Sequence, residues 1–283
     1  MASAWFRLLL TGAVIFCTIA TARPLPVHAP VPGGIAVIDL GAARQPRPKV
    51  AYQGRPVLVT DNEGRWTALV GIPLNTEPGL QSIEMVQGNR TMRLPFRVEP
   101  KEYPAQYIEL PKGKERYVTP PPEDLARIER ESPVLDRILA VWRDTDQVDT
   151  DFHLPVDGSL GSPFGLRRYF NGEPRNPHSG LDLVAPKGTP VKAPAPAKVI
   201  GTGDFFYTGK AVFLDHGQGL LSGYFHLDSI AVKPGQWVKR GDILGTVGAT
   251  GRVTGPHLHM NVYLNGTKVD PELFLRRHLQ AAH

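Results

Sequence analysis

The chain has 283 residues, a formal net charge of +5 and 41% hydrophobic residues, which is enough apolar material for a sizeable core and excludes a disordered protein. Its 29 glycines and 28 prolines are spread along the chain, a composition typical of short strands joined by many turns. The single cysteine excludes an internal disulfide framework and a CxxC metal site. The positive charges form no basic block, so they fit an anionic polymer or surface at least as well as nucleic acid, and we expect no nucleic-acid partner.

Residues 1–22 have the pattern of a secretory signal peptide. Arg7 supplies the positive start, residues 8–20 form an apolar stretch, and residues 20–22 (Ala-Thr-Ala) offer a small-residue cleavage site. The alternative is a membrane anchor, but the stretch is short for a bilayer, so we expect no stable membrane span after cleavage. Cleavage would remove Cys17 and leave the mature chain without a thiol nucleophile.

Residues 23–110 predict a small N-terminal β domain. After a proline-rich lead-in, short strand-like runs alternate with turn residues, and the runs lie at 34–38, 56–60, 66–72, 83–86 and 93–98. Short strands at this spacing predict a β-sandwich-like domain. No catalytic constellation occurs in these runs, so we expect a structural or regulatory module.

Residues 111–150 predict a helical linker. Three prolines at 120–122 precede a stretch with helical periodicity, and Glu123 and Asp124 place acidic groups in its first turn. We expect Pro133 to divide this stretch into two helices, because proline lacks a backbone N–H. The linker is expected to pack between the two domains.

Residues 151–283 return to a β pattern, with strand-like runs at 196–200, 211–214, 220–225 and 257–263. The segment 232–245 is similar to lipoyl- or biotinyl-type carriers, but it lacks a modifiable lysine at a hairpin tip, which favours a shared hairpin type. GxSxG, SxxK and HExxH are absent from the sequence, so it supports neither serine chemistry nor a helix-based zinc peptidase.

His257 and His259 form an H-x-H motif in an apolar run that predicts a strand. Side chains two positions apart on a strand point to the same face. Two neighbouring imidazoles on a buried face need a partner, which a metal ion or a catalytic pairing would supply. Taken alone, the motif also fits a polar sheet face with two solvated histidines.

His178 and Asp182 form an H-x-x-x-D motif. Pro177 and Gly180 argue against a helix here, so we expect a loop that enters a strand. Imidazole nitrogen and carboxylate oxygen are normal zinc ligands, and one histidine of the H-x-H motif would complete a three-ligand site with a position open for water. Taken alone, this motif also fits a surface loop with an incidental ion pair.

Together the motifs resemble the LytM/lysostaphin-type zinc metallopeptidase family, the cell-wall endopeptidases. The family signature is H-x-x-x-D, a middle histidine after a strand, and H-x-H late in the domain. Here these are His178 and Asp182, then His226 in Tyr-Phe-His-Leu, then Thr-Gly-Pro-His-Leu-His ending at His259. The resemblance covers roughly residues 155–275 in order, and no motif position departs from the active pattern.

The resemblance implies a mainly β protein of the Gram-negative two-domain type. A small β-sandwich-like domain at 23–110 and a helical linker at 111–150 would precede an antiparallel β LytM-type catalytic domain at 151–283. The family's roles imply a Zn²⁺ ion held by His178, Asp182 and His259, with His226 and His257 as catalytic histidines. The resemblance does not settle which histidine performs which step.

Other polar residues are left without an assigned role. His153 and His216 match no functional position, and we interpret His216 as structural. Four polar residues precede His178, the first ligand position. They could bind carboxylates of the substrate, or they could form a solvated basic loop. These residues are Arg167, Arg168, Asn171 and Arg175.

The implied function is hydrolysis of peptide cross-bridges in peptidoglycan by an exported, periplasmic endopeptidase. We expect the bond that is cleaved to be D-Ala–diaminopimelate rather than a bond within a glycine bridge. The alternative is a catalytically silent member that activates another cell-wall hydrolase, although all five positions are filled. We also expect the first domain or the linker to shield the cleft until a regulatory protein acts.

Overall fold

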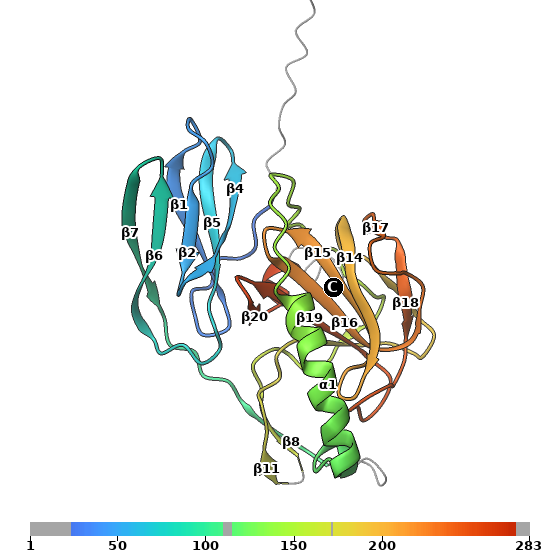
Figure 1. Ribbon diagram of the computed structural model, residues 1–283. Coiled ribbons are helices and arrows are strands. Elements are labelled where there is room, and N and C mark those ends of the chain that lie inside the picture. Colours follow the sequence, from blue (N-terminus) through green and yellow to red (C-terminus); the bar gives the residue numbers. More distant parts are fainter. Residues whose placement is uncertain (1–23, 110–114, 171, 276–283) are drawn as a thin grey trace, which may run out of the picture.

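The computed structural model describes residues 24–109, 115–170 and 172–275. The expected signal peptide and Asn171 lie outside these residues. Within them, two β units are joined by a helical linker (Figure 1). No described helix has both the length and the apolar character needed to cross a bilayer.

The N-terminal unit consists of two antiparallel sheets that share one core, as expected for a β-sandwich-like domain. The first sheet has the order β1-β5-β4, formed by Ile35–Ala42, Arg65–Gly71 and Leu58–Asn62. The second has the order β3-β2-β6-β7, formed by Arg55–Pro56, Lys49–Tyr52, Gly79–Gln87 and Arg90–Val98. Buried side chains from both sheets, such as Val70 and Ile83, belong to one apolar cluster.

The C-terminal unit is built on a ten-stranded sheet, which confirms the antiparallel β prediction. Its main order is β17-β14-β15-β16-β19-β12-β9, while β18 joins β13 to β16 and β20 pairs with β19. The strands are β9 (Ser159–Leu160), β12 (Leu181–Val184), β13 (Pro190–Lys192), β14 (Ala197–Phe205), β15 (Gly209–Gly217), β16 (Leu220–Ile230), β17 (Trp237–Val238), β18 (Ile243–Val247), β19 (Leu258–Leu264) and β20 (Thr267–Val269). Its long central strands carry the second half of the predicted site.

The segment between the sandwich and the catalytic unit, residues 99–150 and called the linker from here on, contributes a strand as well as a helix. Strand β8 (Ala105–Ile108) pairs in parallel with β10 (Arg167–Phe170), which also pairs with β11 (Glu173–Pro174). A 3₁₀ turn, η1 (Glu115–Tyr117), then precedes helix α1 (Pro122–Leu139), which crosses in front of β15 and β16 in Figure 1.

The prediction that Pro133 ends a helix is wrong, because α1 runs through it. Contacts with the β14–β15 region hold the helix on both sides of the proline. Before it, Phe206 N donates to Glu131 Oε2 over 2.8 Å. After it, Ile138 packs into an apolar cluster with Phe205 and Phe213. These tertiary contacts offset the backbone hydrogen bond that proline cannot make.

The two β units pack against each other through both apolar and amide groups. Ile35, Leu58 and Leu69 of the sandwich belong to the same buried cluster as Leu264 of β19. The Asn265 side chain accepts from Gly71 N over 2.7 Å and donates to Gly71 O over 2.9 Å.

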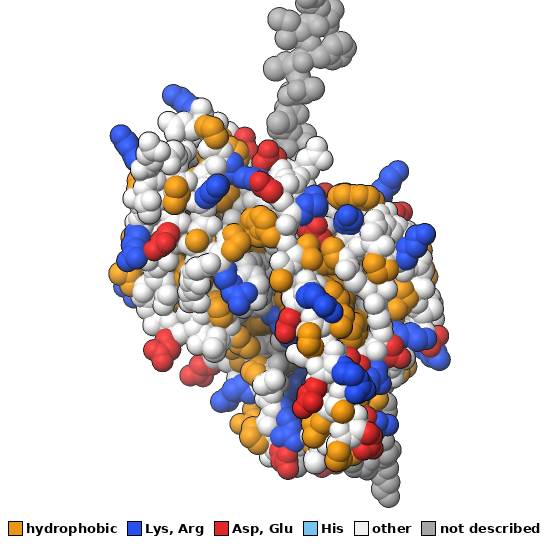
Figure 2. Space-filling model, in the orientation of Figure 1, with side chains coloured by type: hydrophobic (Ala, Val, Ile, Leu, Met, Phe, Trp, Pro, Cys, Tyr) orange, Lys and Arg blue, Asp and Glu red, His pale blue; other side chains and the backbone are white. Residues whose placement is uncertain are grey.

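Figure 2 shows the surface of the molecule in the orientation of Figure 1. Lys and Arg side chains are interspersed with Asp and Glu over both units on that face.

Candidate metal centre and active-site cleft

The structure brings the two halves of the predicted metal site together through strand pairing. Strands β12 and β19 are antiparallel neighbours, and Asp182 lies directly opposite His259 in their register. His178 precedes β12 in a loop held by two backbone hydrogen bonds, from His178 N to Leu166 O (2.8 Å) and from Gly165 N to His178 O (2.7 Å). Residues far apart in sequence therefore meet on one face of the sheet.

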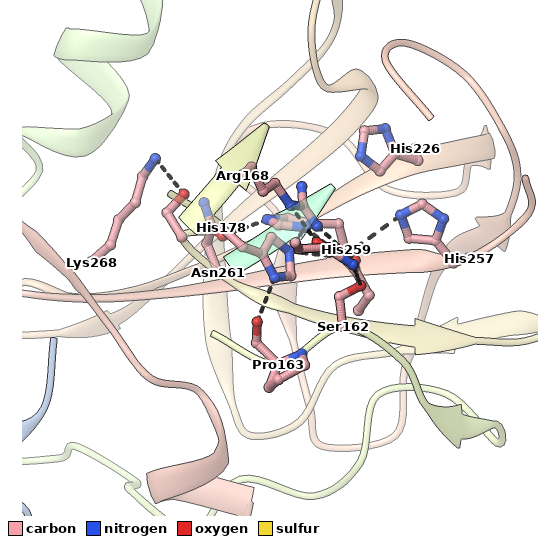
Figure 3. A network of polar contacts seen from close by, with 12 residues as sticks. Ser162, Pro163, Arg168, His178, His226, His257, His259, Asn261 and Lys268 are labelled. Carbon is pink, nitrogen blue, oxygen red and sulfur yellow. Dashed lines mark hydrogen bonds and ion pairs between the residues drawn. The ribbon is translucent and has the colours of Figure 1, made fainter. Parts of the chain in front are cut away.

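Three donor atoms converge at this point (Figure 3). His178 Nε2 lies 3.0 Å from Asp182 Oδ1 and 3.0 Å from His259 Nδ1. His259 Nδ1 lies 2.8 Å from Asp182 Oδ1. Ligand atoms of a tetrahedral ion with bonds of about 2.1 Å lie about 3.4 Å apart, which is close to these separations.

The tautomers of both imidazoles follow from their other partners. Pro163 O lies 2.7 Å from His178 Nδ1 and can only accept, so the proton is on Nδ1 and Nε2 presents a lone pair. Asn261 Nδ2 donates to Tyr263 Oη over 3.0 Å, which turns Asn261 Oδ1 toward His259 Nε2 at 2.7 Å. His259 Nε2 therefore carries its proton, and Nδ1 presents a lone pair.

These assignments leave no proton among the three converging atoms. Two imidazole lone pairs and one carboxylate oxygen would repel one another, and a bound divalent cation would relieve this repulsion. Two nitrogens and one oxygen form a donor set typical of catalytic zinc. The residues present therefore fit a Zn²⁺ ion.

Further contacts orient the three donor residues. Arg168 Nη2 donates to Asp182 Oδ2 over 3.2 Å, which engages the oxygen that does not face the histidines. Arg168 Nε in turn donates to Gln106 Oε1 over 3.2 Å. Gly180 allows a close approach, since a Cβ there would lie 2.2 Å from Asn261 Oδ1 and 2.5 Å from His259 Nε2. Such outer contacts typically fix ligand orientation.

His257 and His226 lie beside the donor cluster, and each has its Nδ1 occupied by a backbone carbonyl. His257 Nδ1 donates to Gly255 O over 2.9 Å, and His226 Nδ1 donates to Thr250 O over 2.8 Å. In the neutral rings each Nε2 therefore presents a lone pair. His257 Nε2 lies 3.7 Å from Asp182 Oδ1, and the centroids of the His226 and His257 rings are 5.1 Å apart.

His226 is held in an unusual backbone conformation. It lies within β16 with a φ of +62°, a region that residues other than glycine seldom adopt. Its backbone N–H donates to Thr208 O over 2.9 Å, outside the regular strand-to-strand hydrogen bonds between β15 and β16. Backbone strain of this kind clusters at functional sites, and here it accompanies a side chain turned toward the cleft.

The electrostatics of the cleft favour neutral imidazoles and an ionised carboxylate. Burial lowers the pKa of His226 well below its ordinary value, and the nearby His259 and His257 lower it further. Burial also lowers the pKa of His259, although Asp182 opposes this shift. Burial raises the pKa of Asp182, and only protonated His178 and His259 rings beside it would lower that pKa well below its usual range, as a bound cation would.

Two cavities adjoin the donor cluster. The larger, of about 350 Å³, is lined by His178, His226 and His259, and also by Tyr117 and Val118 of the linker. The smaller, of about 140 Å³, is lined by Asp182, His226 and His257, and by Gln106 and Ile108 of the linker segment. Figure 3 shows Lys268 on one side of the cluster, with His226 and His257 on the other.

The arginines before His178, which the sequence left open between substrate binding and a solvated basic loop, are engaged with the chain itself. Arg167 Nε donates to Tyr103 O over 3.0 Å, and Arg168 is paired with Asp182. Arg175 pairs with Glu173 and donates to Val118 O over 3.3 Å. Asn171 lies outside the described residues.

Several residues at the site were not anticipated from sequence. Asn261 follows the second histidine of the H-x-H motif by two positions, so strand alternation could have placed it on the same face. Gln106 gave no signal, because its role depends on a strand pairing across 62 residues. Arg252, which lines both cavities, lies five residues before His257 but carries no motif of its own.

Comparisons with known proteins agree with this architecture. The model of peptidase family M23 matches residues 176–271, and that of the peptidase family M23 N-terminal domain matches residues 28–101. A crystal structure assigned to peptidase M23 of Pseudomonas aeruginosa is 46% identical, with a TM-score of 0.74. The alignment covers 88% of this chain and 96% of that one.

Two curated relatives match a smaller part. Peptidoglycan DD-endopeptidase ShyA of Vibrio cholerae is 41% identical over 119 residues, which are 41% of this chain and 28% of the relative. DD-carboxypeptidase/endopeptidase Mpg of Neisseria meningitidis is 39% identical over 112 residues, 40% of this chain and 26% of the relative. The chain thus spans about a quarter of the length of these relatives.

Proposed function

This chain belongs to peptidase family M23, and we propose that it is a zinc-dependent endopeptidase that hydrolyses the peptide cross-bridges of peptidoglycan. The observation that carries the proposal is the convergence of three proton-free donor atoms on His178, Asp182 and His259. His226 and His257 lie beside them with lone pairs available on Nε2. A metal site flanked by two bases in a cleft is suited to hydrolysis of an amide.

Different residues of the chain would then hold the metal and transfer the proton. Zinc held by His178, Asp182 and His259 would supply water activation and polarise the scissile carbonyl. His257 is the residue we assign to general acid–base catalysis. In the neutral ring the proton is on Nδ1 and Nε2 faces Asp182 at 3.7 Å, so Nε2 can accept a proton from the attacking water and return it to the leaving amine.

His226 is assigned a positioning role toward the same water. Because its Nδ1 proton is held by Thr250 O, its Nε2 can accept a hydrogen bond but cannot donate one in the neutral form. Stabilising a developing oxyanion would require donation, and hence a protonated ring. The neutral tautomer therefore favours orienting the water over oxyanion stabilisation.

We further propose that the bond cleaved is D-Ala–diaminopimelate and that the protein acts in the periplasm. The names of ShyA and Mpg support a bond between D-configured residues. The leader-like sequence of residues 1–22 supports export. A regulatory protein that controls access to the cleft is a further part of this proposal.

Digestion of purified cross-linked muropeptides tests the proposed reaction. We expect diaminopimelate-type dimers to be split into monomers, seen by mass spectrometry, and a chelator to abolish the reaction until zinc is restored. Cleavage of glycine-bridged dimers instead would reject the proposed bond. Zinc binding without cleavage of either dimer would favour a silent activator of another hydrolase.

A further inference from the structure

Arg252 is a half-buried cation with no anionic partner in the described part of the chain. Its guanidinium lies over the rings of Tyr207 (4.8 Å to the centroid) and Phe170 (5.2 Å). No described carboxylate or carbonyl accepts a hydrogen bond from that guanidinium. Arg168 and Arg175, by contrast, are paired with Asp182 and Glu173.

Arg252 also lies where a substrate would be held. It lines both cavities, and it shares each of them with His226 and His259. A group bound to Arg252 would therefore lie in the same cleft as the bond presented to the donor cluster.

The cleft around Arg252 carries an excess of positive charge. Arg168, Arg175 and Lys268 also line the larger cavity, while the one acidic residue among all the described lining residues is Asp182. Asp182 is already engaged by Arg168 and the two histidines. Burial lowers the pKa of Arg252, and so do the charges of Arg168 and Arg175, so an anion bound there would relieve an unfavourable environment.

We propose that Arg252 binds a free carboxylate on the substrate, on the carbon attached to the leaving nitrogen. This inference rests on the proposed function, because a D-Ala–diaminopimelate bridge carries such a carboxylate beside the scissile amide. A guanidinium pairs with a carboxylate through two parallel hydrogen bonds. Tyr207 and Phe170 hold its plane in advance, which reduces the entropy lost on binding.

The test compares two substrates that differ only at this carboxylate. One is the diaminopimelate-type cross-linked dimer, and the other is the same dimer amidated at that position. Zinc-loaded full-length protein is assayed as wild type, Arg252→Gln and Arg252→Lys. Arg93→Gln is the charge-matched control, because Arg93 is exposed on β7 and pairs with Glu84 away from the cleft.

We expect Arg252→Gln to lower kcat/KM on the free-carboxylate dimer by about 10- to 100-fold, the range for a charge-assisted hydrogen bond. Its rate on the amidated dimer should match wild type, which would show that the variant is folded. The kcat/KM of Arg252→Lys on the free-carboxylate dimer should lie between those of wild type and Arg252→Gln, since lysine keeps the charge but not the bidentate geometry. Arg93→Gln should behave as wild type on both dimers.

Two results would overturn the inference. One is an equal loss on both dimers, which would indicate a structural role for Arg252, and the other is no loss on either. If wild type cleaves neither dimer, the proposed function fails, and calorimetric binding of the two dimers decides the carboxylate site separately. A preference for the free carboxylate that disappears in Arg252→Gln supports it, and equal affinities in wild type contradict it.

Discussion

At the residue scale, His216 shows how this sheet accommodates a buried imidazole that has no catalytic role. Its Nδ1 donates to Pro196 O over 3.2 Å, and its Nε2 accepts from Ser222 Oγ over 2.8 Å. Ser222 Oγ lies 2.9 Å from Tyr224 Oη, which continues the chain of hydrogen bonds. Each link uses one proton, so His216 is neutral in the folded protein.

Because His216 is buried and neutral, we predict that the free energy of unfolding falls in acid. Burial, with the nearby charge of Arg143, lowers its pKa from 6.5 to about 3, so between these values the unfolded chain binds the extra proton. Stability from this group is present above pH 6.5 and falls as the pH falls, by about 2 kcal/mol between pH 7 and pH 5.

Denaturant unfolding at pH 7 and pH 5 checks this component. The fall in unfolding free energy should be smaller in His216→Gln than in wild type by about that amount. The variant loses some stability at both pH values, so only the difference between the two pH values is compared. The same pH dependence in both proteins would contradict the assignment.

At the element scale, strand β8 connects the linker to the metal site. Gln106 donates to Ser162 Oγ over 3.0 Å and accepts from Arg168, which holds the outer oxygen of Asp182. We predict that Gln106→Leu weakens zinc binding by up to about tenfold, because outer contacts of this kind orient metal ligands.

Competition against a chromogenic chelator measures this effect directly. Tyr107→Ala is the control on the same strand, since Tyr107 is 73% exposed and its ring stacks on Tyr169 rather than on Arg168. Zinc affinity unchanged in Gln106→Leu, or lowered equally in both variants, would show that β8 does not act through Arg168.

The elements also show which features a sequence can predict. The common face of His257 and His259 was within reach, because alternation fixes which side chains of one strand share a face, whereas the pairing of Asp182 with His259 followed only from the family resemblance. The parallel pairing of β8 with β10 was not, since parallel strands leave no hairpin signal between them. Pro133 misled the helix prediction, because contacts with β14 and β15 override a local preference.

At the scale of the whole molecule, the sandwich and the catalytic sheet share a buried cluster rather than a loose contact. The sandwich supplies none of the described residues that line the two cavities beside the donor cluster. The linker supplies Gln106, Ile108, Tyr117 and Val118. Shielding of the cleft stays a prediction, and the lining residues favour the linker over the sandwich as the shielding part.

Metal content and cleavage measured on the same preparations test the proposed zinc peptidase most directly. Wild type, His259→Ala and His257→Ala would be purified, analysed for zinc, and assayed on diaminopimelate-type dimers. We predict stoichiometric zinc in wild type and in His257→Ala, loss of zinc in His259→Ala, and loss of cleavage in both variants. Wild type without zinc, or His259→Ala with full zinc and activity, would contradict the assigned metal site.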